Sequence, residues 1–442
     1  MKKKIFSIVL VITPVIFYCQ KLSLLQCIDT ALAKNPQIEK YIQYNKIQKF
    51  NKIISHREYL PEVSVLMNNN LGLGTDQDVF GNTRRNDNFN NSILLNTQWF
   101  LYNGSKNKFN SLKNDFDYQS GLSDIETIKR DISINVVNQY LKTLLSKEIH
   151  EISTNSVQDA LKIFNKVEKS FELGYSTKTE VLEAKSNLSK ERQREQIALL
   201  DVKKNLLDLA LLLQINDEES FEIENEFIPD DIEDNFPVIN DLLDEIINND
   251  PKIKSLELKL NSAKNQTEII KTSMKPTASL ISNIGSFYFN SLVADNEYQF
   301  FKQIQLNFYQ QFRLNVSIPI FNKGISKLQV EKSKINEDII INDILIEKKD
   351  LSNTIKKIFF DKNQNFKNYI LSKEVEDDMK KTKELTGKSY TEGYSTIYEL
   401  NNSTKNWVEA ISILKQFKYK YYFDLLLLDI YTKGYSNIKY LF

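Results

Sequence analysis

Two short stretches of this sequence nearly repeat each other: Phe171-Glu-Leu-Gly-Tyr-Ser-Thr177 and Tyr390-Thr-Glu-Gly-Tyr-Ser-Thr396. They share the run Gly-Tyr-Ser-Thr, and their glycines, Gly174 and Gly393, are 219 residues apart. Each stretch lies between two long segments that contain no proline. A glycine at such a place permits the left-handed conformation that closes a helix C-terminus. The pair therefore predicts two helical hairpins and an internal duplication of the chain.

The helix that follows each glycine begins with the same capping signal. Thr177-Lys-Thr-Glu180 and Thr396-Ile-Tyr-Glu399 both have the Thr-x-x-Glu pattern of a capping box. In this arrangement the threonine hydroxyl accepts the amide of the third residue, and the glutamate accepts the threonine amide. A stop signal followed at once by a start signal predicts a tight reversal between two helices.

Other landmarks repeat at nearly the same spacing. The matched prolines are 215 residues apart, and the pairs later in the chain are 219 residues apart. One longer loop in the second copy would produce this difference in spacing. The sequence therefore predicts two copies of one unit: helix, two strands, long helix, turn and returning helix. The matched positions are Asn35-Pro36 with Asp250-Pro251, Pro61 with Pro276, Leu95-Asn96 with Leu314-Asn315, and Asn103 with Asn322.

The longest predicted helices are Ser105–Leu173 and Ile325–Glu392, each interrupted by a single glycine, Gly121 and Gly387. At 1.5 Å per residue such a helix is about 100 Å long, which globular domains rarely need. Helices of this length bury an apolar stripe against other helices, as in a coiled coil. The predicted return helices are Lys178–Gln214 and Ile397–Lys433, and Leu22–Tyr59 is predicted as one further helix, ended by Pro61.

Between these helices the hydrophobic period changes from 3.6 to 2, which predicts strands at about 62–74, 88–100, 277–289 and 305–319. The last is the clearest. Such strands suit either a tilted membrane-spanning sheet or a half-buried sheet of a soluble protein, and the alternation alone favours the second. In that strand Leu306, Phe308, Phe312, Leu314, Val316 and Ile318 alternate with polar residues and Tyr309.

The N-terminus predicts a secretory signal peptide at residues 1–19, because Lys2-Lys3-Lys4 precede the short apolar run Ile5–Tyr18. Cleavage before Gln20 is the preferred interpretation. The alternative is a lipoprotein in which Cys19 is acylated, although Tyr18 is bulky where lipoprotein signals carry a small residue. No later stretch reaches the ~18 apolar residues of a membrane helix.

Composition narrows the possible functions. Lys+Arg and Asp+Glu are both 58, so the chain has no basic footprint for nucleic acid. Eleven glycines and eight prolines suit long helices. Residues 216–240 form an acidic connector within the lysine- and arginine-free stretch Asp217–Asp250, and a solvated surface is preferred there over a cation site.

No catalytic constellation is present in the sequence. The two histidines, His56 and His150, are far apart, and there is no phosphate-binding glycine loop and no nucleophile elbow. Only Cys27 remains after cleavage, which excludes an internal disulfide. The sequence therefore predicts no enzyme, no cofactor and no metal site.

The order and duplication of these pieces resemble the TolC-type outer-membrane efflux protein family over nearly the whole mature chain. The fold class that this resemblance implies is mainly α with membrane β. The first structural repeat is 20–215, with its hairpin tip near 174, and the second is 241–442, with its tip near 393. The matching pieces are Leu22–Pro36, Trp99-Phe-Leu-Tyr-Asn-Gly104, Ile318-Pro-Ile-Phe-Asn-Lys-Gly324 and the two Gly-Tyr-Ser-Thr turns.

The resemblance implies a homotrimer in the cell outer membrane, with a twelve-stranded β-barrel and a long periplasmic α-helical barrel. Residues 74–87 and 290–302 would be extracellular loops. Such a protein is a passive exit duct of a tripartite efflux or type I secretion system, opened by a periplasmic adaptor protein and fed by an inner-membrane transporter. The residues leave the exported substrate open.

The resemblance also implies roles for residues at the two tips. Tyr390, Glu399 and Asn402, with Thr179 and Glu180, correspond to gate and constriction positions. Asn402 stands where the family often has a second acid, and Ser395 where some members have a basic gate residue, which weighs against a double acidic ring and a salt-bridged latch. The adaptor-docking tips are Gly174, Tyr175, Ser176, Gly393, Tyr394 and Ser395.

The alternative interpretation is a periplasmic adaptor or a coiled-coil scaffold protein. Adaptors also carry long helical hairpins, but they normally place one hairpin between the halves of a β-domain. Two strand pairs at matched offsets favour the channel.

Overall fold

The computed structural model of the chain describes residues 21–77, 79–215, 221–225, 239–294 and 299–435. The predicted signal peptide, Cys19 and most of the acidic connector lie outside the described residues. The chain forms two compact units: one holds Lys40–Ile125 and Pro251–Lys349, and the other holds the remaining segments, chiefly Glu126–Asp250 and Asp350–Phe442.

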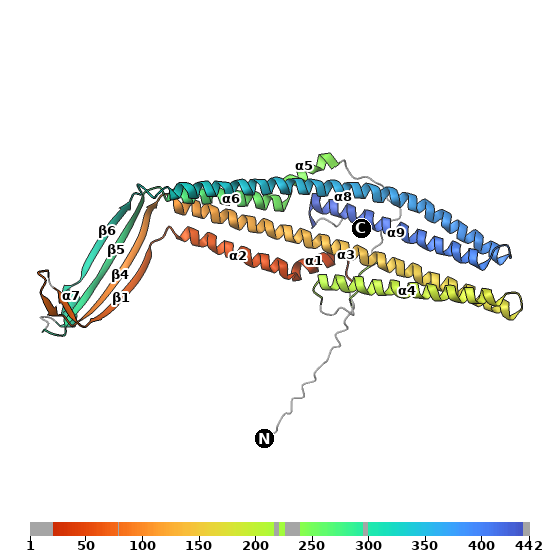
Figure 1. The fold of residues 1–442 in the computed structure, drawn as a ribbon, viewed down its shortest axis with the longest axis horizontal. Coiled ribbons are helices and arrows are strands. Elements are labelled where there is room, and N and C mark those ends of the chain that lie inside the picture. The colour runs from red at the N-terminus through yellow and green to blue at the C-terminus, as the bar shows by residue number, and fades with distance from the viewer. Residues whose placement is uncertain (1–20, 78, 216–220, 226–238, 295–298, 436–442) are drawn as a thin grey trace, which may run out of the picture. The chain divides into compact units, whose positions relative to one another are not determined.

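The first unit contains an antiparallel sheet in the order β1-β4-β5-β6, with β1 and β6 at its two edges (Figure 1). Helices α2 (Pro36–Arg57) and α6 (Pro251–Thr272) lead into β1 and β5, so the two repeats contribute matching helix–strand pieces. The strands are β1 (Glu62–Gly72), β4 (Asn88–Asn103), β5 (Thr277–Ser291) and β6 (Tyr309–Ser317), and the hairpin β2 (Thr75–Gln77) with β3 (Thr83–Arg85) lies within the predicted loop 74–87.

The register of the sheet separates apolar from polar residues. Val65 pairs with Leu95, which pairs with Ile284, while the next residue, Asn96, pairs with Asn283. Because successive side chains of a strand point to opposite faces, these two rows lie on opposite faces of the sheet. The predicted period-2 pattern is therefore present in the folded sheet.

The predicted strand at 305–319 is wrong at both ends, because β6 spans only Tyr309–Ser317. The first two residues of the predicted strand, 305 and 306, are instead the last residues of α7 (Phe300–Leu306), a short helix that packs on β5. There Gln303 donates to the Phe289 carbonyl at 3.0 Å, and Asn307 donates to the Phe287 carbonyl at 2.8 Å. Side-chain amides therefore take the place of a strand partner along this part of β5.

The single helix predicted over Leu22–Tyr59 is also wrong. The structure has α1 (Leu24–Lys34) and α2, separated at Asn35, whose backbone is extended. Pro36 has no amide hydrogen and disfavours helical geometry in the residue before it. The Asn35 side chain accepts the Gln37 amide at 2.8 Å and so caps the second helix.

The two long helices are α3 (Lys106–Glu172) and α8 (Ile325–Thr391), each of 67 residues. α3 begins one residue after its predicted start, and α8 begins at its predicted start. Each start lies just past one of the matched asparagines, Asn103 and Asn322. A 67-residue helix is about 100 Å long. Among the described residues, no helix has a stretch that is both long and apolar enough to cross a bilayer.

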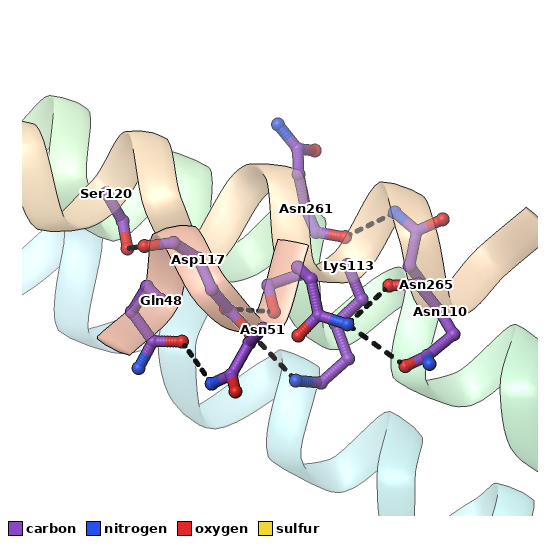
Figure 2. A network of polar contacts seen from close by, with 10 residues as sticks. Gln48, Asn51, Asn110, Lys113, Asp117, Ser120, Asn261 and Asn265 are labelled. Atoms are coloured by element: carbon purple, nitrogen blue, oxygen red, sulfur yellow. Dashed lines mark hydrogen bonds and ion pairs between the residues drawn. The ribbon is translucent and has the colours of Figure 1, made fainter. Parts of the chain in front are cut away.

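Polar contacts hold the helices of the first unit together. Figure 2 shows Asp117 of α3, whose carboxylate accepts a hydrogen bond from the Lys113 ammonium group of the same helix at 2.8 Å. The other carboxylate oxygen of Asp117 accepts the hydroxyl of Ser262 from α6 at 2.5 Å. Asp124 of α3 pairs with Lys259 of α6 at 2.9 Å. Polar pairs occupy these inner contacts, and many apolar side chains of α2 and α8 remain exposed.

The second unit holds α1, α5 (Ile239–Asn249), most of α3 and α8, and the return helices α4 (Lys178–Leu212) and α9 (Ile397–Lys433). Its core includes Tyr140, Leu209, Ile355 and Leu426, each fully buried. The described part of the acidic stretch is not simply solvated. Ile223 is buried and bridges to Leu22, and α5 forms a helix within Asp217–Asp250. Burial of the apolar residues Phe221 and Ile223 therefore decides the local structure, in spite of the acidic composition of this stretch.

Gly285 of β5 is predicted to be essential for the sheet. A Cβ at this position would lie 2.2 Å from the Ile93 carbonyl oxygen and 2.9 Å from Leu94 Cα. Both are backbone atoms of β4, so Gly285→Ala forces the strands apart and is expected to abolish folded protein in membrane extracts. Gly72→Ala is the matched control, because its Cβ meets only the Asn88 side chain, at 3.4 Å. Equal yields of the two variants would contradict this account of the β4–β5 contact.

The α8–α9 contact predicts a specific pH dependence of stability. Asp424 is buried, and burial raises its pKa from 3.8 to about 6, although Asn365 donates to it at 2.7 Å. The folded state therefore holds this proton more tightly than the unfolded chain, and stability falls as the pH rises from about 4 to 6. Asp424→Asn is expected to raise the Tm by a few degrees at pH 7.5 and to leave it unchanged at pH 4. An equal shift at both pH values in calorimetry would show that Asp424 acts through packing instead.

Candidate functional site

One face of the sheet is apolar and open to its surroundings. Val65, Met67 and Leu314 are 63%, 61% and 63% exposed. Soluble monomers rarely leave a contiguous apolar face of this kind uncovered. Its exposure favours the membrane interpretation of the strands over a half-buried soluble sheet. Further exposed members of this face are Val63, Leu71, Ile93, Leu95, Trp99, Phe312 and Val316.

The opposite face is more polar, although Leu66, Phe287 and Phe289 also belong to it. Asn96 of β4 donates to Asn283 of β5 at 2.7 Å, directly across the ladder. Asn, Ser and Gln residues occupy much of the rest of this face, including Ser64, Asn68, Asn70, Asn90, Ser92 and Gln98. A polar face backed by an apolar one suits a wall between water and lipid.

The two edge strands, β1 and β6, each pair on one side only, with β4 and β5, and their outer sides have no strand partner among the described residues. The helix that leads into β1 and the helix that follows β6 both carry exposed apolar stripes. In α2 the stripe contains Ile47, Phe50 and Ile54. In α8 it contains Leu328, Ile335, Ile339 and Ile346, which are 7, 4 and 7 residues apart, as in a coiled-coil seam.

The second candidate site is the pair of helix reversals. Gly174 and Gly393 have φ of 82° and 86°, in the left-handed region. The amide of Tyr175 donates to the Ser170 carbonyl at 2.8 Å, and that of Tyr394 donates to the Ser389 carbonyl at 2.9 Å. These bonds close the C-termini of α3 and α8.

Both predicted capping boxes are confirmed. The Thr177 hydroxyl accepts the Glu180 amide at 3.3 Å, and the Glu180 carboxylate accepts the Thr177 amide at 2.7 Å. The second tip repeats this with distances of 3.2 and 2.8 Å for Thr396 and Glu399. Glu180 and Glu399 therefore each have a structural role at the start of a return helix.

The predicted docking residues lie at the surface of the turns. Tyr175 and Tyr394 are 85% and 83% exposed, and Ser176 and Ser395 are half-buried. Each turn thus presents one aromatic ring to solvent beside a glycine. Exposed Tyr is a residue type that protein interfaces favour.

Beneath the turns, an apolar cluster joins the two hairpins. Val167, Val181, Ala184 and Ile397 are buried together, and Tyr390 packs against them. Tyr390 is the predicted gate residue that the structure places in a contact between hairpins. Its burial, and after that the negative charge of Glu180, raises the pKa of the Tyr390 hydroxyl.

Near the turns, two polar contacts also connect the hairpins, and neither stands out in the sequence. Asn187 of α4 donates to Asn401 of α9 at 3.1 Å. Lys383 of α8 lies 3.1 Å from Asp159 of α3. In sequence these are ordinary amides and charges of long helices, and only their arrangement in space identifies them.

The other predicted gate residues are more exposed. Thr179, Glu399 and Asn402 lie on the surface, and Asn402 lines a polar groove of about 400 Å³ between α4 and α9. Within the part of the chain that the structure describes, no group of three or more His, Cys, Asp or Glu residues could hold a metal ion.

Removal of the second cap is predicted to loosen the start of α9. Thr396→Ala takes away the acceptor of the Glu399 amide, which typically costs about 1 kcal/mol. Hydrogen exchange of the amides in residues 397–400 is expected to accelerate, while Thr396→Ser retains the hydroxyl and the protection. Unchanged exchange in Thr396→Ala would mean that the cap does not hold this turn.

The comparisons with known proteins agree with this geometry. Residues 27–213 match the family model described as outer membrane efflux protein. None of the curated proteins matches the sequence significantly.

Solved structures of outer-membrane channels share the fold. The outer-membrane channel OprN has a TM-score of 0.78 at 14% identity, with 93% of this chain and 89% of that chain covered. VceC of Vibrio cholerae has a TM-score of 0.77 at 14% identity, with 93% and 96% covered. CmeC of Campylobacter jejuni has a TM-score of 0.73 at 18% identity, with 93% and 85% covered.

Proposed function

We propose that this chain, which belongs to the outer membrane efflux proteins by the match of its first repeat and by its fold, is the exit duct of an export system in the outer membrane. The observation that carries this proposal is the sheet with one exposed apolar face and two unpaired edges. The family is one of channels, not of enzymes.

The unpaired edges support a homotrimer. Four strands cannot close a barrel, and open edges in lipid leave backbone amides and carbonyls without partners. In a ring of three copies, β6 of one copy pairs with β1 of the next, which gives twelve strands and no edge. The apolar stripes of α2 and α8 would meet at the same seams, since these helices flank the two edge strands.

The paired hairpins support a gate at the two turns. Tyr390, Glu399 and Asn402, with Thr179 and Glu180, are the proposed constriction residues. For the channel to open, the hairpins must part, which breaks the Asp159–Lys383 and Asn187–Asn401 contacts. Those contacts are partly exposed, so each contributes about 1 kcal/mol or less. The apolar cluster around Ile397 therefore supplies most of the energy that an adaptor must overcome to separate the hairpins.

The proposed partners are a periplasmic adaptor protein, which binds the exposed turns, and an inner-membrane transporter, which supplies the energy. The docking residues are Gly174, Tyr175 and Ser176, and Gly393, Tyr394 and Ser395. Two exposed tyrosines on short glycine turns offer an adaptor rigid aromatic contacts with little entropy to lose. An adaptor or coiled-coil scaffold, the alternative function, does not account for the exposed apolar sheet face.

The proposal is tested in planar lipid bilayers. Detergent-extracted protein is expected to insert as discrete, long-lived conductance steps. An extract of cells that carry Gly285→Ala, which is expected to contain no folded protein, serves as the inactive control. Protein that fractionates with the soluble periplasm and never produces steps would contradict the proposal.

The charge of Glu399 is predicted to matter independently of its cap. Glutamine also completes a capping box, so Glu399→Gln keeps the turn while it removes one negative charge per copy. The variant is expected to keep its Tm and to show reduced cation preference, measured as a smaller reversal potential in a KCl gradient.

Thr396→Ala is the reciprocal control, because it removes the cap and keeps the charge. It is expected to leave the reversal potential unchanged. A reversal potential that Glu399→Gln does not alter would exclude Glu399 from the constriction.

A further inference from the structure

A cavity of about 420 Å³ lies between the two hairpins and is formed by three helices. α3, α8 and α9 all contribute to its wall, so it belongs to neither hairpin alone. Its size is that of a site for a small organic molecule. Its lining includes Ile163, Lys166, Lys380, Gly387, Leu400 and Trp407.

The cavity is open because of one glycine. Gly387 is the only glycine within α8, and glycine in a helix interior costs about 1 kcal/mol relative to alanine. A Cβ built there meets only Leu400 Cδ1, at 3.9 Å, and nothing closer. Neither strain nor close packing requires glycine at this position, and its missing side chain leaves the space that the cavity occupies.

The wall of the cavity combines an apolar floor with a positive rim. Ile163, Leu400 and the ring of Trp407 supply the apolar surface. The Trp407 ring is oriented on one side by its indole N–H, which donates to Glu376 at 2.8 Å. On another side, Lys383 Nζ lies 4.0 Å from the ring centroid.

The charges of the lining do not balance. Four lysines (162, 166, 380 and 383) line the cavity against two carboxylates, Asp159 and Glu384, which leaves a net charge of +2. The Asp159 carboxylate already forms ion pairs with both Lys162, at 3.4 Å, and Lys383, at 3.1 Å. Lys166 lies 5.8 Å from the centroid of the Tyr390 ring. Lys166 and Lys380 therefore provide the excess positive charge of the rim.

We propose that this cavity binds a small amphipathic anion, an aromatic carboxylate or sulfonate. Its ring would lie on Ile163, Leu400 and Trp407, and its anionic group would lie near Lys166 and Lys380. The ligand would touch α3 of one hairpin and α8 and α9 of the other. Binding would therefore oppose separation of the hairpins, a regulation additional to the exit-duct function. Detection of the site itself does not depend on conduction.

The test uses the fluorescence of Trp407. The chain has two tryptophans, and Trp99→Phe leaves Trp407 as the only one. The probe is 3,5-dinitrobenzoate, a nitroaromatic anion that quenches indole on contact, added to the purified full chain. Saturable quenching is expected, and the uncharged 3,5-dinitrobenzamide is expected to bind at least fivefold more weakly.

Two sets of variants locate the site. Gly387→Leu fills the cavity and is expected to abolish saturable quenching without a lower Tm, since there is room for its side chain and it favours the helix. The pair Lys166→Gln and Lys380→Gln is expected to weaken binding of the anion about tenfold and binding of the amide little. The matched double control is Lys381→Gln with Lys388→Gln, which removes two charges of α8 outside the cavity.

Three results would overturn the proposal: quenching that does not saturate, quenching that Gly387→Leu leaves intact, or equal affinity for the anion and the amide. None of these bears on whether the protein forms pores. If the cavity instead accepts side chains of a partner protein, the free anion does not bind, and the first result is observed.

Discussion

A strand at the edge of a sheet that faces lipid must find a hydrogen-bond partner, because the hydrocarbon offers its amides and carbonyls none. This requirement governs the arrangement of the first unit. The chain supplies four strands with an exposed apolar face, and it leaves β1 and β6 open. The helices that flank these edges carry exposed apolar stripes at coiled-coil spacing. The open strand edges and the exposed helix stripes therefore both favour association with further copies of the same chain.

The second unit follows a different balance of interactions. Its core around Tyr140, Leu209 and Leu426 is fully buried, whereas the hairpins near the turns share one small apolar cluster and a few polar contacts. Opening is expected where the fewest buried contacts are lost. The capping boxes keep each turn rigid in itself. In the proposed opening, the hairpins would therefore separate as intact bodies, without unwinding at their ends.

Much of this fold could be predicted from the sequence because its signals are local. Glycine turns, capping threonines, missing prolines and period-2 alternation each act within a few residues, and together they located the long helices and three of the four strands to within a few residues. The failures arise where a distant partner decides. Gln303 and Asn307 bond to the backbone of β5, which places the first residues of the predicted strand 305–319 in and just after α7. Ile223 is buried in spite of its acidic neighbours because it bridges to Leu22. The contacts between the hairpins carry no local signal at all.

Trimer assembly is tested most directly by the number of chains in the assembled particle. Native mass spectrometry of the protein, extracted from outer membranes in detergent, measures that number without any assumption about transport. The proposed twelve-stranded barrel, built from four strands per copy, predicts a single species of three chains. A stable monomer would contradict trimer assembly, because it would leave the outer edges of β1 and β6 without a strand partner in the membrane, and a stable dimer would contradict the twelve-stranded barrel.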